Sequence, residues 1–161
     1  MTATMLPTLL APLIGTFTGA GVGEFPTVDP FRYREEVTFT SNGSPVLAYR
    51  QRTWDLDSGR PMHAEDGFLR LAGDTRAEFL LAHSFGLTEV QEGDLEVEGA
   101  PDGVLRLRLA STAIGVAGSA KPVDAVRREL ALDGNVLHSE LWMSYAGMES
   151  QHLVSELHRV D

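Results

Sequence analysis

Two segments of the sequence combine residue types that could build a ligand site. Glycines at odd-numbered positions open the chain (Gly15, Gly19, Gly21 and Gly23), and His152 stands alone near its end. In an extended strand these glycines share one face without side chains, so another backbone or a ligand can approach closely. A neutral imidazole binds a metal through one ring nitrogen. The spacing leaves the alternatives open: His152 could be a surface or hydrogen-bonded histidine, and the glycines could only let the strand bend.

The composition excludes several other kinds of chemistry. The chain has no cysteine, so it has no disulfide scaffold, thiolate-bound metal or cysteine nucleophile. It contains no Gly-x-Ser-x-Gly, phosphate-binding-loop or His-Glu-x-x-His motif. Thirteen Lys and Arg residues stand against 23 Asp and Glu, a formal net charge of −10. We therefore expect neither nucleic acid nor an anionic membrane as a partner.

The N-terminal region does not predict a targeting segment. The first basic residue is Arg32, so the charged start of a signal peptide is missing. No apolar run reaches the roughly 18 residues that a membrane span requires. We expect a cytoplasmic protein that folds as a single domain over residues 1–161.

Alternation with a period of two dominates the chain and predicts the elements that would position these residues. Leu105, Leu107 and Leu109 alternate with Arg106 and Arg108, as in a half-buried antiparallel strand. Short glycine-bearing turns separate such runs: Asn42-Gly43, Asp57-Ser-Gly59, Asp66-Gly67, Glu92-Gly93, Asp102-Gly103 and Asp133-Gly134. The pattern predicts an all-β meander of about ten strands.

Helical periodicity occurs only near the start, at Leu6, Leu9, Leu10 and Leu13. Two prolines keep this helix short, and we expect it to close one end of the fold as an apolar plug.

A meander of this length forms a closed barrel or a two-sheet sandwich. The bare glycine face favours the barrel because it allows sharp bending. The sequence therefore predicts an antiparallel up-and-down β-barrel with a short N-terminal helix.

The order of motifs along nearly the whole chain resembles the nitrobindin family of small haem-binding β-barrels, which are similar to fatty-acid-binding proteins. The shared motifs include Gly15-Thr-Phe17-Thr-Gly19-Ala-Gly21, Gly23-Glu-Phe-Pro-Thr27, Arg50-Gln-Arg-Thr-Trp54, Gly59-Arg-Pro-Met-His63-Ala-Glu and the closing His152-Leu. Phe17 is the visible departure, because the family usually has Trp there. Phe lacks the indole donor, so the change affects packing where the barrel closes.

The resemblance implies haem b in a wide cleft at the barrel mouth, with His152 as the axial ligand of the iron. It also implies a haem contact for Thr27 and a propionate-neutralising role for Lys121, with Met62 and His63 lining the cavity. It implies no catalytic residue beyond the haem iron. Of the other histidines, His83 is expected in the core and His138 on the surface.

The activity that the resemblance implies is isomerisation of peroxynitrite to nitrate at ferric iron, with nitric oxide binding at ferrous iron. The partners would be small molecules, and the protein a monomer or homodimer. An alternative of another class is a haem-free carrier of a fatty acid or other small hydrophobic ligand. Such a carrier needs a basic cluster inside its cavity, and the sequence does not place one.

Overall fold

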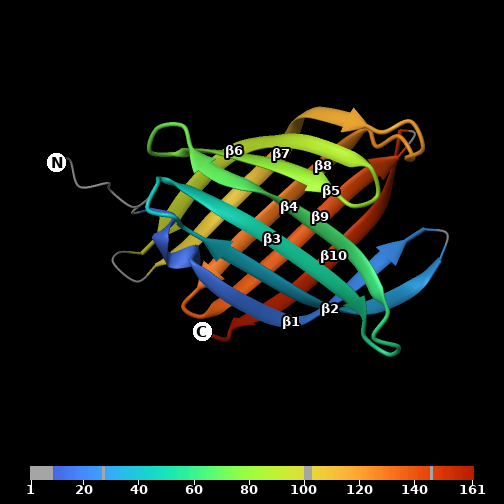
Figure 1. Ribbon diagram of the computed structural model, residues 1–161, viewed down its shortest axis with the longest axis horizontal. Helices are drawn as coiled ribbons and strands as arrows, with labels where there is room; N and C mark the ends of the chain where they lie inside the picture. Colours follow the sequence, from blue (N-terminus) through green and yellow to red (C-terminus); the bar gives the residue numbers. More distant parts are fainter. Residues whose placement is uncertain (1–8, 27, 100–102, 146) are drawn as a thin grey trace.

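The computed structural model describes residues 9–26, 28–99, 103–145 and 147–161. Ten antiparallel strands close into a barrel in which each strand pairs with its neighbour in sequence and β1 pairs with β10 (Figure 1). This confirms the predicted barrel. After the 3-10 helix η1 (Ala11–Leu13), the strands are β1 (Gly15–Phe25), β2 (Val28–Thr40), β3 (Val46–Asp55), β4 (Pro61–Leu71), β5 (Arg76–His83), β6 (Leu87–Glu98), β7 (Val104–Val116), β8 (Ala125–Asp133), β9 (Val136–Tyr145) and β10 (Met148–Arg159).

Alternate residues of each strand face the interior, as the period of two predicts. In β5 the buried positions are Ala77, Phe79, Leu81 and His83, and the residues between them are more exposed. None of the helices in the described part of the chain has the length and hydropathy that a membrane span requires.

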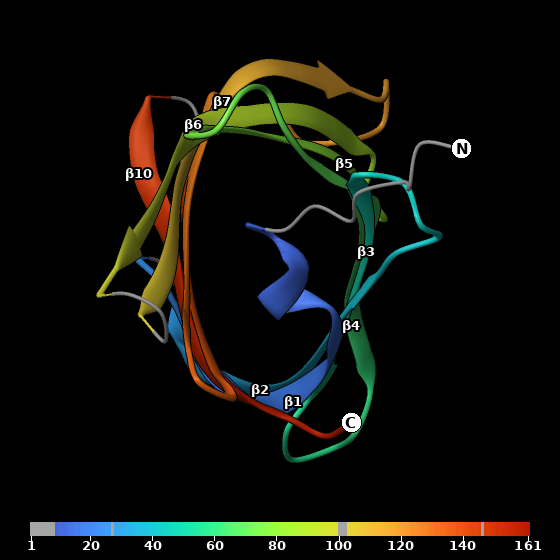
Figure 2. The same cartoon turned by 90° about the vertical axis from the view of Figure 1, so that its left-hand side faces the viewer.

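The N-terminal plug closes one end of the barrel, and η1 lies across the lumen in the end-on view (Figure 2). Leu10 and Leu13 are fully buried in the main core, together with Phe17, Phe39 and Phe79. The helix is only three residues long because Pro12 lies in its first turn and β1 begins at Gly15. Leu6 of the predicted apolar stripe lies outside the described residues.

The bare face of β1 is filled from the neighbouring strands. A Cβ on Gly19 would lie 2.1 Å from the carbonyl oxygen of Glu156 in β10. At Gly21 the space is occupied by the ring of Tyr33, and at Gly23 by the ring of Phe31. The glycines therefore let β1 approach β10 and make room for two aromatic rings of β2, both of which reach the cavity described next.

Candidate functional site

The half of the barrel away from η1 contains a cavity of about 280 Å³. Its walls are largely apolar and aromatic, formed by Phe25, Phe31, Tyr33, Met62, Phe85, Leu141, Met143, Tyr145 and Leu153. The polar side chains that line it are Glu35, Gln51, Thr53, His63, Glu65, His83, Arg128, Ser139 and Gln151. An apolar pocket with a few polar groups is the usual form of a small-molecule or cofactor site.

A buried ion pair crosses the interior beneath this cavity. Arg128 Nη1 of β8 donates to Glu65 Oε1 of β4 at 2.8 Å, and Nη2 donates to Oε2 at 3.3 Å. Tyr49 Oη also donates to Glu65 Oε1, at 2.6 Å. Burial would raise the pKa of Glu65, but the guanidinium and the adjacent histidines hold that pKa well below its usual range. Glu65 is therefore a buried carboxylate anion.

His83 extends this ion pair into a charged network. Its Nδ1 lies 2.9 Å from Glu65 Oε2, and its Nε2 lies 2.6 Å from Glu89 Oε2 on β6. Burial would lower the pKa of His83, but the hydrogen bonds to the two carboxylates outweigh it and raise the pKa to about 9. The ring therefore carries a proton on each nitrogen at neutral pH. The sequence expectation that His83 is a satisfied core histidine is confirmed.

Glu35 is the second buried carboxyl group at the base of the cavity. It accepts hydrogen bonds from Ser155 Oγ and, at 2.7 Å, from Gln51 Nε2. Burial raises the pKa of Glu35 despite these two donors. Together Glu35, Gln51, Glu65, His83, Glu89 and Arg128 form a polar layer between the apolar core and the cavity.

Two of the residues expected to line the cavity do so. Met62 and His63 lie at the start of β4, and both reach the cavity. His63 is partly exposed, and its ring lies 5.4 Å from that of His83 and 5.6 Å from that of Phe85, centre to centre. This end of β4 therefore brings an imidazole and a thioether to the apolar wall.

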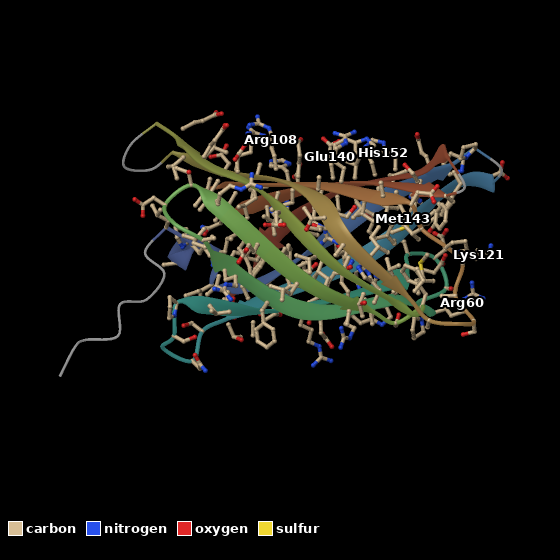
Figure 3. All side chains as sticks on the ribbon, turned by 90° about the horizontal axis from the view of Figure 1, so that it is seen from above. Arg60, Arg108, Lys121, Glu140, Met143 and His152 are labelled. Atoms are coloured by element: carbon tan, nitrogen blue, oxygen red, sulfur yellow. The ribbon has the colours of Figure 1, made fainter. Side chains whose placement is uncertain are left out.

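His152 lies on the outer side of the barrel wall in this structure. Its flanking residues Gln151 and Leu153 line the cavity, whereas its own ring stacks on Trp142 of β9 at 5.1 Å and 16°. Its Nε2 lies 3.2 Å from Glu140 Oε2, and both side chains are more than one-third exposed. Figure 3 shows His152 and Glu140 together on this outer face. The structure does not bring His152 together with His63 and Met62.

The other expected contacts lie at or beyond the cavity mouth. Lys121 is exposed in the connection between β7 and β8 and does not line the cavity. Arg60, which the sequence reasoning did not select, is exposed in the turn before β4. Figure 3 shows both cations at the same end of the barrel as the cavity-lining Met143. Thr27 lies outside the described residues.

The residues of the cavity fit a haem group in their chemistry. Imidazole and thioether side chains are ligands that haem iron accepts, and apolar walls suit a porphyrin face. The exposed cations Lys121 and Arg60 at this end of the barrel suit the carboxylate groups of the haem propionates. The arrangement suits a fatty-acid carboxylate less well, because Arg128 and His83 are both already paired with buried carboxylates.

Comparisons with known proteins agree with this fit. The chain is 45% identical over 151 residues to "Peroxynitrite isomerase 1" of Mycolicibacterium paratuberculosis, covering 93% of this chain and 92% of the relative. It is 44% identical over 151 residues to "Peroxynitrite isomerase" of Nocardia farcinica, covering 93% and 88%. The crystal structure of Rv2717c from M. tuberculosis superposes with a TM-score of 0.89 at 39% identity, covering 98% of this chain and all of that one.

The family comparison covers almost all of the barrel. The family described as "THAP4-like, heme-binding beta-barrel domain" matches residues 8–159, from before η1 to the end of β10. The resemblance to nitrobindins in the sequence motifs is confirmed. The chain belongs to this THAP4-like family of haem-binding β-barrel domains, with haem as its cofactor.

Proposed function

We propose that this protein is a haem-dependent peroxynitrite isomerase, which converts peroxynitrite to nitrate, and that it also binds nitric oxide. The observation that carries the proposal is the cavity, whose imidazole and thioether groups lie on apolar walls in a haem-binding family fold. The names of the relatives at 44 and 45% identity support the reaction. Bound haem would supply an iron centre that acts as a Lewis acid toward the anionic oxidant.

The proposed axial ligand is His152, on the basis of the closing motif. Neighbouring residues of a strand face opposite sides, so a one-residue change of register would move its imidazole to the cavity face. The pairing of β10 with β9 already shifts between Glu149 and Gln151, just before this residue. The outer contacts of His152 are half-exposed and contribute little stability. The same change of register would turn Leu153 out of the cavity, so haem binding has to compensate for this loss of apolar burial as well.

The remaining roles follow from the positions of the side chains around the mouth. His63 presents a ring nitrogen at the cavity and can donate a hydrogen bond to a bound anion. Phe31 and Phe85 provide apolar walls that limit water beside His63, which strengthens such a bond. Lys121 and Arg60 would neutralise the propionates at the rim. No side chain is required as a general base.

Absorption spectroscopy of histidine variants tests this proposal. His152→Ala should lose the axial bond, so the Soret band should change and both haem affinity and the rate of peroxynitrite decay to nitrate should fall sharply. His63→Ala should retain haem and lose part of the rate. His138→Ala and His158→Ala, at exposed positions, should match the wild type. A wild-type spectrum and rate in His152→Ala would refute the ligand, and failure of the wild type to bind haem would favour the lipid carrier.

A further inference from the structure

We propose that His63, Glu65 and His83 form a second metal site, separate from the haem ligand, for a borderline divalent transition-metal ion such as Zn²⁺ or Fe²⁺. These residues come from β4 and β5, next to each other in the barrel, and all three line the cavity. One ligand atom of each lies within a single small cluster. Two imidazoles and one carboxylate are a ligand set that such ions prefer.

Two of the three distances between the ligand atoms match those around a metal ion, and the third is shorter. His63 Nε2 lies 3.3 Å from His83 Nδ1 and 3.4 Å from Glu65 Oε2, and His83 Nδ1 lies 2.9 Å from that same oxygen. Metal bonds of about 2.0–2.2 Å in tetrahedral geometry place neighbouring ligand atoms about 3.3–3.6 Å apart. The site therefore requires only small movements of side chains to accept an ion.

Hydrogen bonds from surrounding residues orient two of the ligands. His83 directs its Nε2 to Glu89, which fixes the ring and leaves Nδ1 toward the cluster. Tyr49 Oη and Arg128 Nη1 donate to Glu65 Oε1, whereas Oε2, which also accepts from Arg128 Nη2 at 3.3 Å, is the oxygen directed toward both histidines. A carboxylate behind a metal-binding histidine is the usual support in metal sites. The ion would replace the proton on His83 Nδ1, which leaves to solvent.

The ion would keep an open coordination position. Glu65 and His83 are buried, whereas His63 is 28% exposed at the cavity side. Three protein ligands with room for a fourth from the cavity is the arrangement of catalytic rather than structural zinc sites. A water molecule or a small anion would occupy this position from the cavity.

The test separates this site from the exposed histidines. His138, His152 and His158 also lie within 4 Å of carboxylates, so a background variant replaces all three with Ala. This variant, together with the as-purified wild type, is dialysed against Zn²⁺ and Co²⁺. The background variant should retain one ion per chain, with the visible absorption bands of Co²⁺ bound by nitrogen and oxygen. Loss of all specific binding in this background would overturn the proposal.

Single substitutions in this background identify the ligands. His63→Ala should weaken Co²⁺ binding at least a hundredfold, and Glu89→Gln, which alters the support of His83, about tenfold. His63 is partly exposed, so His63→Ala should fold, as circular dichroism would verify. An unchanged Co²⁺ affinity and spectrum in His63→Ala would refute the site. Because this background lacks His152, the result does not depend on whether His152 binds haem.

Discussion

The buried pair of Arg128 and Glu65 should be strongly coupled in its effect on stability. Their side chains are 5% and 3% exposed, so water cannot solvate either charge if its partner is removed. Glu65→Gln leaves the guanidinium facing a protonated His83, and Arg128→Met leaves a carboxylate with His83 as its remaining cation. Removing one partner of a buried ion pair costs about 3–5 kcal/mol. We expect Glu65→Gln at the upper end of this range and Arg128→Met at the lower end.

The double variant should lose less stability than the sum of the two single variants. Glu65→Gln with Arg128→Met removes both charges and keeps most of the side-chain volume, so no unpaired ion remains from this pair. We expect a coupling energy of at least about 2 kcal/mol. Urea unfolding of the haem-free protein, followed by circular dichroism, measures all four free energies of unfolding. Additive effects, or single losses below about 1 kcal/mol, would refute the assignment of Arg128 and Glu65 as a charged, water-excluded pair.

Three further predictions concern the barrel and its mouth. A Cβ at Gly93 would lie 1.7 Å from a backbone carbonyl of β7, so Gly93→Ala should destabilise the fold by about 3 kcal/mol or more, whereas Gly118→Ala, in open space, should change the urea midpoint little. Phe79 is fully buried, so Phe79→Ala should cost about 3–5 kcal/mol in the same measurement; a loss under about 1 kcal/mol would contradict its place in the core. Lys121→Ala and Arg60→Ala should each weaken haem binding a few-fold at low salt and less at high salt, as measured by haem titration; equal effects at both salt concentrations would exclude a screened charge contact.

The strands could be predicted because each one carries its own pattern, but the polar layer could not. Alternation in β7 and turns such as Asn42-Gly43 and Asp133-Gly134 are local signals, and they were sufficient for a closed meander. Two of the predicted turns were wrong: Asp66-Gly67 lies within β4 and Glu92-Gly93 within β6, where each glycine lets a neighbouring backbone carbonyl approach closely. Arg128 and Glu65 are 63 residues apart in the sequence and lie on strands that are not neighbours. Their pairing therefore depends on which residues face each other across the barrel interior, and no local pattern gives this. A signal was available: Glu35 and Arg128 each occupy the apolar face of their strand, where a charge requires a buried partner.

The sequence also contained a signal about His152. It shares its face with Val154 and Glu156, whereas Leu153 and Leu157 lie on the other face, and Leu157 is fully buried in the core. The two-residue alternation therefore predicts that His152 points to the outer side, as it does in the structure. The closing motif instead predicts that His152 binds the iron. The proposal that His152 binds the iron rests on the closing motif. The alternation of residues along β10 shows that this role requires a one-residue change of register.

The pairing of β1 with β10 means that the first and last strands depend on each other. Phe17 lies opposite Arg159, whose guanidinium donates to the carbonyl oxygens of Ile14 and Pro12 beside the plug. During synthesis β1 emerges early, yet its partner follows roughly 130 residues later. Until then β1 and β9 present unpaired edges, which are sites for association with other chains. The barrel therefore has a slow, late closing step, in which a growing chain is exposed to aggregation.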